Sequence, residues 1–229
     1  MPELPPIVIA ALTGFISGML LSIPVGPVNL TIMNEGARRG FWWALLIGLG
    51  ASTMEVIYCG IAFTGFSSFF VNRLVKASME VFSFVFMVFL GVKFLVAKTV
   101  VAPTHLSDAA DKIEERIEEK LHPHSAFMIG FVRTMANPGV LLFWIILAAN
   151  FISREWVEPN RASKLACISG VALGTGLWFC GLSWLVSKGH RKLNVQTLLR
   201  MEHFSGIALL ILALLHGGHI AWQLAKNKM

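Results

Sequence analysis

The sequence is poor in charge. Of its 229 residues, only 14% are Asp, Glu, Lys or Arg, whereas soluble domains average about 25%. A chain with so few charges cannot cover a globular surface, which argues against a soluble enzyme, a nucleic-acid-binding protein and a disordered regulator. The formal net charge of +6 is expected of a membrane protein whose basic loops face anionic lipid, and it does not indicate nucleic acid.

Cysteine is scarce, and the N-terminus carries no basic residue. The three cysteines lie inside apolar stretches rather than in loops. We therefore predict neither a disulfide framework nor a metal site, and we expect no cofactor. Because Met1–Pro6 lacks Lys and Arg, the first apolar run does not resemble a removable signal peptide, and we expect it to remain in the mature protein.

Apolar residues are abundant: they make up 55% of the chain, and the mean hydropathy is +0.69. They gather in runs of about 20 residues, the length of a helix that crosses the hydrocarbon core of a bilayer. The runs predict an all-α polytopic membrane protein with six transmembrane helices: Ile7–Met33, Phe41–Phe66, Ser78–Ala97, Ala126–Phe151, Leu165–Ser187 and Phe204–Leu224.

One polar stretch divides the predicted helices into two groups of three. We interpret residues 1–98 as a first three-helix repeat, 99–124 as a cytoplasmic linker and 125–229 as a second repeat. Apolar residues recur every four positions among the linker charges, which is typical of a short amphipathic helix; a solvated helix without a function of its own is the alternative. More Lys and Arg lie on the linker side of the membrane, which places both termini outside.

The two halves share a pattern in the same order. Gly14-Phe15 and Gly130-Phe131 are each followed by a proline-glycine break, Pro24-Val25-Gly26-Pro27 in the first half and Asn137-Pro138-Gly139 in the second. Because each group has an odd number of helices, the second would insert upside down relative to the first, as in many secondary transporters. The pattern predicts two inverted three-helix repeats in which helices 1 and 4 are broken.

A second echo joins the predicted second and fifth helices, where Tyr58-Cys59-Gly60 corresponds to Phe179-Cys180-Gly181. Glycine is frequent in both helices, and small residues in membrane helices allow two backbones to approach closely. We therefore expect close helix contacts at Gly14, Gly18, Gly48, Gly50, Gly60, Gly170, Gly174, Gly176 and Gly181.

The two breaks form the predicted substrate site. A proline inside a membrane helix frees a carbonyl that lipid cannot satisfy, so breaks persist only where protein or water lines them. The second half of a broken helix presents free N–H groups and a partial positive charge, which suit a carboxylate or another anion. Prolines that only kink the helices for packing are the alternative. The predicted site contains Pro24, Gly26, Pro27, Asn29, Asn137, Pro138 and Gly139.

Two charged residues complete the predicted site. Glu55 is the only acidic residue deep in a predicted helix, and a charge at mid-helix costs at least about 2.5–3.5 kcal/mol. Glu55 must therefore face the interior, to pair with a substrate or to carry a coupling proton; a helix–helix hydrogen bond through a protonated carboxyl is the alternative. Arg133 either approaches Glu55 or a substrate carboxylate, or extends to the lipid headgroups.

These motifs resemble those of the lysine-exporter (LysE/RhtB-type) translocators. The resemblance implies a multi-pass secondary exporter of the bacterial inner membrane, driven by the proton gradient or by exchange, that acts on amino acids or their derivatives. The chain departs from the commoner Pro-Gly-Pro form, and it carries Glu55 where many members have no acid. The motifs that carry the resemblance are Gly14-Phe15-Ile16-Ser17-Gly18, Ser22-Ile23-Pro24-Val25-Gly26-Pro27-Val28-Asn29, Glu35-Gly36-Ala37-Arg38-Arg39-Gly40, Gly130-Phe131, Asn137-Pro138-Gly139, Gly170, Gly174 and Trp178.

The sequence thus predicts proton-coupled export of a small zwitterion, an amino acid or a derivative. A divalent-cation exporter of the same superfamily is an alternative, although one deep acid offers few ligands. An intramembrane enzyme lacks paired acids, a Ser/His pair or a metal-ligand motif, and a non-transporting scaffold leaves the paired breaks and Glu55 unexplained. Expected partners are a small-molecule substrate and membrane lipid, without nucleic acid; a homodimer is left open.

Overall fold

The computed structural model describes residues 5–24, 26–65, 116, 125–188 and 195–226, and residues 81, 84–85, 88–89 and 91–96. Within these ranges the secondary structure is α-helical and no strand occurs, which confirms the all-α prediction. Most of the predicted third helix and nearly all of the predicted linker lie outside the described residues. The helices with defined bounds are α1 (Pro6–Ser22), α2 (Pro27–Arg39), α3 (Phe41–Gly65), α6 (Ala126–Ala136), α7 (Pro138–Ser153), α8 (Arg161–Ser187) and α9 (Val195–Lys226).

Two long helices and two bent helix pairs lie at the positions of four predicted spans. α3 and α8 are each long and apolar enough to cross a membrane. α1 and α2 meet at an angle of 70°, and α6 and α7 at 68°, and each pair has the length and composition of one broken span. In α9, the apolar helical part that the structure describes, His203–Leu215, is shorter than a span. The described residues therefore contain two to four spans, and the predicted six are not all seen.

The bends lie where the sequence predicts breaks. Pro27 and Pro138 occupy the first turns of α2 and α7, where a missing N–H costs nothing because that group has no partner inside the helix. Gly26 precedes α2 in an extended conformation, and Asn137 caps α7 by accepting a hydrogen bond from the Gly139 N–H at 3.0 Å. Both predicted breaks, in helices 1 and 4, are confirmed.

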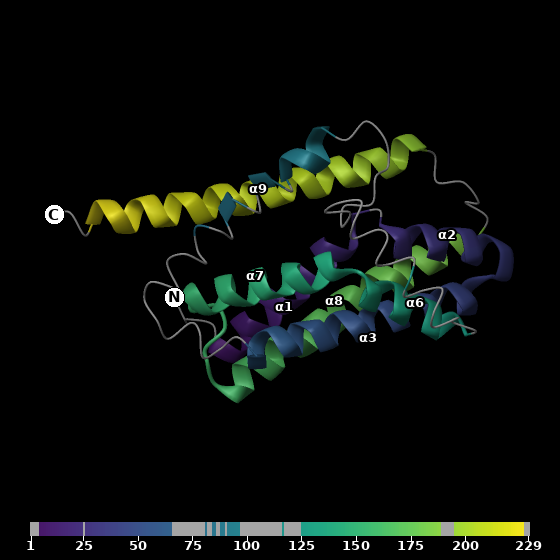
Figure 1. Ribbon diagram of the computed structural model, residues 1–229, viewed down its shortest axis with the longest axis horizontal. Helices are drawn as coiled ribbons and strands as arrows, with labels where there is room; N and C mark the ends of the chain where they lie inside the picture. The colour runs from purple at the N-terminus through teal and green to yellow at the C-terminus, as the bar shows by residue number, and fades with distance from the viewer. Residues whose placement is uncertain are drawn as a thin grey trace.

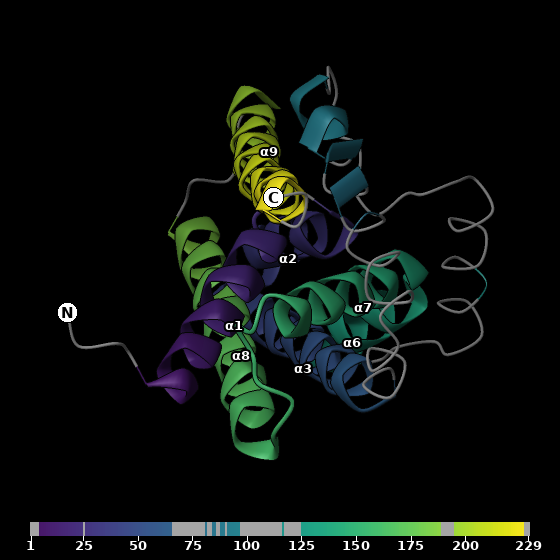
Figure 2. The ribbon, with the colours of Figure 1, turned by 90° about the vertical axis from the view of Figure 1, so that its left-hand side faces the viewer.

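The described helices run mainly along one long axis (Figure 1). One end of the molecule lies on the left in Figure 1. It contains the first residues of α1 and α8 and the last residues of α3, α7 and α9. Viewed from that end, α9 and the described residues between 81 and 96 lie together on one side of a bundle of α1, α3, α7 and α8 (Figure 2). A close approach of Gly91 and Gly206 joins α9 to these residues.

Two helix pairs approach until their backbones touch. α1 packs on α8, where a Cβ atom added at Gly14 would collide with the backbone of Cys167. α3 packs on α6, where a Cβ atom at Gly130 would collide with the backbone of Ile47. Reciprocal contacts come from the partner helices at Gly170 and Gly50. The broken helix of each half therefore packs on the straight helix of the other half.

The glycine prediction is confirmed at some positions and wrong at others. Gly14, Gly18, Gly48, Gly50, Gly170 and Gly174 all make close contacts. At Gly60, Gly176 and Gly181, in contrast, an added Cβ atom would meet no described atom within 4 Å. These three glycines lie on partly or fully exposed faces of α3 and α8, away from the helix crossings.

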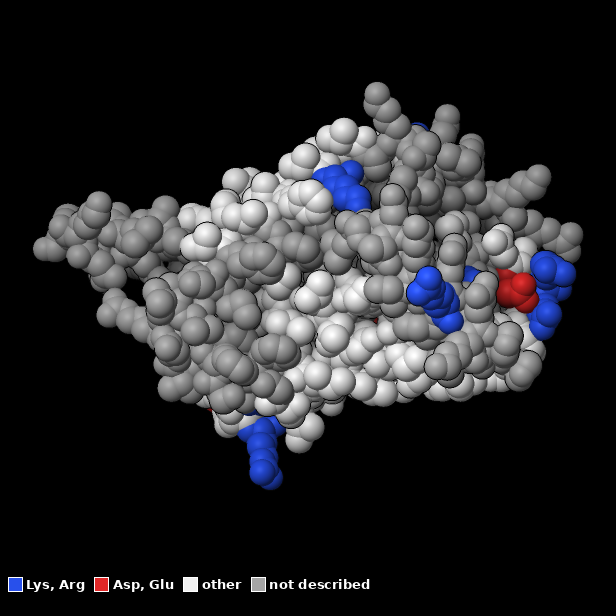
Figure 3. Space-filling model, viewed as in Figure 1, with Lys and Arg blue, Asp and Glu red and all other residues white. Residues whose placement is uncertain are grey.

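Large apolar side chains lie both inside and outside the bundle. Trp144 and Phe63 are buried in the largest core cluster, whereas Leu173 is 67% exposed and Ile16 is 52% exposed on outer helix faces. On the face in Figure 3, one cluster of acidic and basic side chains lies at the end of α2, where Glu35 pairs with Arg38 and Arg39. Many large apolar side chains on the described outer faces are exposed, which suits contact with lipid.

Candidate substrate site

A cavity of about 70 Å³ lies where the two breaks meet α3 and α8. All the predicted site residues line it except Pro138 and Gly139, which belong to the first turn of α7 but are not part of the lining. The two breaks, more than 100 positions apart in the chain, thus contribute to one space. The lining residues are Leu21, Ser22, Pro24, Gly26, Pro27, Val28, Asn29, Glu55, Arg133, Thr134, Asn137, Val140 and Phe179.

Asn29 holds the first break together. Its side-chain amide donates to the carbonyl of Ser22 at 2.8 Å and to that of Pro24 at 2.7 Å. Its Oδ1 atom accepts a hydrogen bond from the indole N–H of Trp178, with Nε1 and Oδ1 3.4 Å apart. Ser22 is the last residue of α1 and Pro24 lies in the break, so Asn29 satisfies backbone groups that the break releases.

The N-terminus of α2 opens into the cavity. Gly26 is its N-cap, and among the described residues no side chain caps this helix end. The first N–H groups of an α-helix have no partner inside the helix, and Pro27 has no N–H at all. The N–H groups of Val28 and Asn29, both lining residues, are therefore the donors that this helix end offers to an anion.

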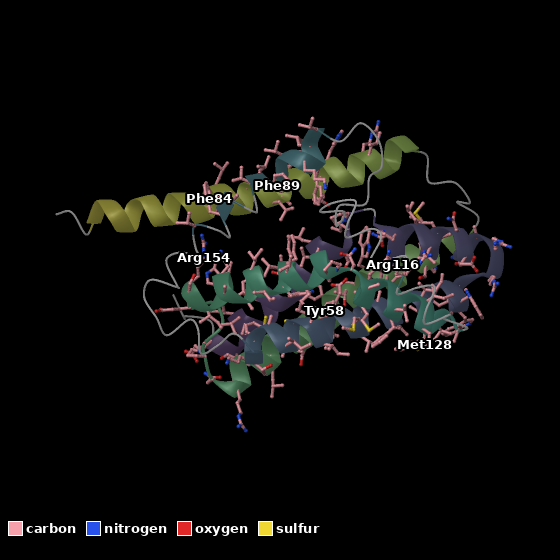
Figure 4. All side chains as sticks on the ribbon, in the orientation of Figure 1. Tyr58, Phe84, Phe89, Arg116, Met128 and Arg154 are labelled. Atoms are coloured by element: carbon pink, nitrogen blue, oxygen red, sulfur yellow. The ribbon has the colours of Figure 1, made fainter. Side chains whose placement is uncertain are left out.

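The second break is organised differently. Gly139 would donate to the carbonyl of Met135 in a continuous helix, but its N–H donates to the side chain of Asn137 instead. The released Met135 carbonyl accepts a hydrogen bond from the hydroxyl of Tyr58, on α3, at 2.6 Å. Figure 4 shows Tyr58 in the middle of the bundle, between α3 and α7.

Arg133 lies beside the open end of α2. It comes from α6, lines the cavity, and donates a hydrogen bond from Nη1 to the Thr31 hydroxyl. Thr31 itself donates to the carbonyl of Pro27 at 2.7 Å. The guanidinium is thus connected to the first turn of α2 at the wall of the cavity.

Glu55 supplies negative charge to the same cavity. The residue is 9% exposed, and its Oε2 atom has no hydrogen-bond partner in the described part of the chain. The hydroxyl of Thr134, another lining residue, is likewise buried without a partner among the described groups. Since buried polar atoms are normally hydrogen-bonded, these two oxygens mark the part of the wall that is chemically unsatisfied.

Sequence reasoning did not identify Thr31, Thr134, Tyr58 or Phe179 as part of this region. Thr31 and Thr134 carry no local signal, because a threonine in a membrane helix usually bonds to its own backbone. Tyr58 offered a signal: it is the only tyrosine in the chain, and a buried phenol requires a partner.

Long apolar helices and bent helix pairs around a charge-lined cavity are the arrangement of a membrane transporter. The chain matches the model of the LysE type translocator family over residues 19–217, and it belongs to that family. Membership confirms the resemblance drawn from the motifs, and it identifies an integral membrane translocator rather than an enzyme.

Three relatives, with different named functions, align with most of the chain. The chain is 27% identical to YcgF of Bacillus subtilis, a protein named for amino acid efflux, over 90% of this chain and 94% of the relative. It is 27% identical to the arginine exporter ArgO of Salmonella newport over 76% of each chain. It is 22% identical to the chemotactic transduction protein ChpE of Pseudomonas aeruginosa over 89% of this chain and 94% of the relative. No solved structure matches the chain.

Proposed function

We propose that the protein exports a small zwitterion, an amino acid or a close derivative, through the cavity between its two breaks. The observation that carries the proposal is the pair of opposite charges, Glu55 and Arg133, in one cavity of an apolar bundle. Charges inside a membrane protein are costly and are retained where they act on a substrate or an ion. The efflux and exporter functions named for two relatives support the same substrate class.

The two charges give the substrate an orientation. Its carboxylate docks at the open N-terminus of α2, where the N–H groups of Val28 and Asn29 and the guanidinium of Arg133 provide donors and positive charge. Its ammonium pairs with the unsatisfied Oε2 atom of Glu55, beside the Thr134 hydroxyl. In this proposal, Asn29, Asn137, Pro138 and Gly139 shape the breaks, and Pro24, Gly26 and Pro27 form the wall around the carboxylate.

The remaining wall favours a neutral substrate side chain. Leu21, Val28, Val140 and Phe179 present apolar atoms to the cavity. Glu55 is the only carboxylate among the described lining residues, and the substrate ammonium already uses it. A cationic side chain would therefore have no counter-charge there, and a divalent cation would meet one carboxylate and a repelling guanidinium instead of several oxygens.

In this proposal, the two halves of the protein move relative to each other and open the cavity to one side of the membrane at a time. Bends of 70° and 68°, together with the reciprocal glycine contacts of α1 with α8 and of α3 with α6, support two inverted repeats, residues 1–98 and 125–229, that rock against each other. Glu55 carries the coupling proton when no ammonium is bound. In this proposal the protein lies in the bacterial inner membrane with both termini outside and the linker in the cytoplasm, alone or as a homodimer.

The test removes each charge from protein reconstituted in liposomes. We expect Glu55→Gln and Arg133→Gln each to reduce counterflow of labelled alanine at subsaturating concentration at least tenfold, the equivalent of about 1.4 kcal/mol of lost binding. Thr53→Val and Arg161→Gln, at exposed positions on α3 and α8, are the matched controls and should transport as the parent does. Parent-like counterflow in both charge variants would refute the proposed site.

A further inference from the structure

One aromatic donor reaches each break from the straight helix that packs on it. In α3, Tyr58 follows the crossing glycine Gly50 by eight positions, and in α8, Trp178 follows Gly170 by eight positions. Tyr58 bonds to Met135, at the break of α6 and α7, and Trp178 bonds to Asn29, at the break of α1 and α2. The same spacing at the two reciprocal helix crossings thus places one hydrogen-bond donor at each break. Measured from the crossing glycines, Tyr58 corresponds to Trp178, one position before its counterpart Phe179 in the sequence pattern.

At the second break, the contact of Tyr58 decides where a released carbonyl points. Met135 has lost its helical donor, because the Gly139 N–H is taken by Asn137. The phenol of Tyr58 replaces that donor from α3, one helical turn after Glu55 on the same helix. The position of the second break is thereby tied to the helix that carries the cavity carboxylate.

At the first break, the contact of Trp178 acts through a side chain. Asn29 uses both amide hydrogens on the Ser22 and Pro24 carbonyls. Its remaining oxygen accepts from the Trp178 indole, which fixes the orientation of the whole amide group. Asn29 lies in the first turn of α2, so Trp178 holds the open N-terminus of α2 in place relative to α8.

We propose that Tyr58 and Trp178 are paired positioning residues that hold the two breaks in the geometry that binds substrate. The inference rests on the proposed function of the cavity, since it concerns how tightly a substrate is held there. Neither residue touches substrate. Tyr58 aligns the second break with Glu55, and Trp178 aligns the N–H donors of α2 with the carboxylate position.

The test removes each donor and keeps an aromatic ring at each position. Tyr58→Phe deletes only the hydroxyl, and Trp178→Phe deletes the indole N–H together with the five-membered ring that carries it. Trp184→Phe is the matched control on α8, because Trp184 is 52% exposed and its ring lies against the ammonium of Lys188. Each protein is placed in lipid nanodiscs for amide hydrogen exchange of residues 24–31 and 134–141, and in liposomes for alanine counterflow.

We expect each variant to disturb one break and to weaken binding. Tyr58→Phe should speed exchange of the Asn137, Gly139 and Val140 amides about fivefold, the effect of one lost hydrogen bond, and leave residues 24–31 unchanged. Trp178→Phe should speed amide exchange in residues 24–31 and leave residues 134–141 unchanged. Both should raise the KM for alanine about fivefold and keep the maximal rate within twofold, while Trp184→Phe matches the parent.

The outcomes separate the two proposals. A parent protein that transports no amino acid would refute the proposed function, and the exchange pattern would still report on the two contacts. A transporting parent with unchanged KM in both variants would overturn the positioning role. Equal acceleration at both breaks in either variant would also overturn it, because general loosening of the fold, and not local positioning, would then explain any change in KM.

Discussion

At the scale of single residues, the position of a residue along the chain predicts whether it lies inside the membrane, but it does not predict in which direction its side chain points. The depth of Glu55 in an apolar run was enough to predict an interior carboxylate. The direction of Arg133 depends on how α6 is rotated against α2, which no local pattern records, so both directions had to stay open. The partners of Asn29 were equally hidden, because a break of unknown geometry does not say which carbonyls it releases.

The charge state of Glu55 decides how transport is coupled. If Glu55 carries the proton, Glu55→Gln should insert normally, since a neutral amide is less costly in the bilayer than a carboxylate. Residual export should then lose its dependence on pH, because the variant has no proton to release. Flux measured between about pH 5.5 and 8.5 for the parent and the variant checks this.

Two other outcomes have clear meanings. If the variant transports weakly but keeps the pH dependence of the parent, another group carries the proton, and Glu55 serves only the substrate ammonium. Unchanged flux at every pH would remove Glu55 from the site altogether. Thr53→Val, two positions away on an exposed face of α3, controls for nonspecific effects on the helix.

At the scale of helices, the breaks and the crossings differ in how well the sequence specifies them. Pro27 and Pro138 act through the covalent structure of proline, so the breaks could be predicted from the sequence alone. Glycines act only if another helix lies opposite them. The sequence could not distinguish Gly130, which touches α3, from Gly60, which meets no described atom within 4 Å, because both are glycines in apolar helices.

This difference predicts opposite effects of the same substitution. Gly130→Ala should destabilise the protein by about 1–3 kcal/mol, since its Cβ atom would collide with the Ile47 backbone and force α3 and α6 apart. Gly60→Ala should leave stability unchanged or raise it by up to about 1 kcal/mol, because alanine is the better helix former. Thermal unfolding in detergent, followed by circular dichroism, measures both.

Equal losses in the two alanine variants would contradict the packing of α6 on α3. Gly14→Ala offers a second comparison at the crossing of α1 and α8, with Gly176→Ala as its control on α8. The same ranking is expected there.

At the scale of the whole molecule, the order of elements was predictable, whereas their pairing was not. Hydropathy runs place helices along the chain: two of the six predicted runs correspond to helices long enough to span a membrane, and two more correspond to the bent helix pairs. The packing of each broken helix on the straight helix of the opposite half depends on contacts between residues far apart in the chain, such as Gly14 with Cys167 and Gly130 with Ile47, which hydropathy does not contain. The predicted third span lies mostly outside the described residues.

α1 begins and α9 ends at the same end of the molecule (Figure 1). We therefore predict that both termini lie on the same side of the membrane. In cells, a single cysteine placed after Lys228 should react with an impermeant maleimide added outside, and one placed near Arg191 should react only after the membrane is opened. Cys59, Cys167 and Cys180 are first replaced by alanine so that only the introduced thiol is labelled. The reverse labelling would invert the predicted orientation.

The measurement that tests the central claim most directly is uptake into inside-out membrane vesicles that contain the parent protein. Labelled alanine, threonine and arginine, and cadmium ions, are compared with and without a proton gradient. We predict saturable accumulation of the neutral amino acids, weaker accumulation of arginine, none of cadmium, and loss of the signal in the Glu55→Gln/Arg133→Gln double variant. Accumulation of cadmium without amino acids, or amino acid uptake that persists in the double variant, would contradict the account.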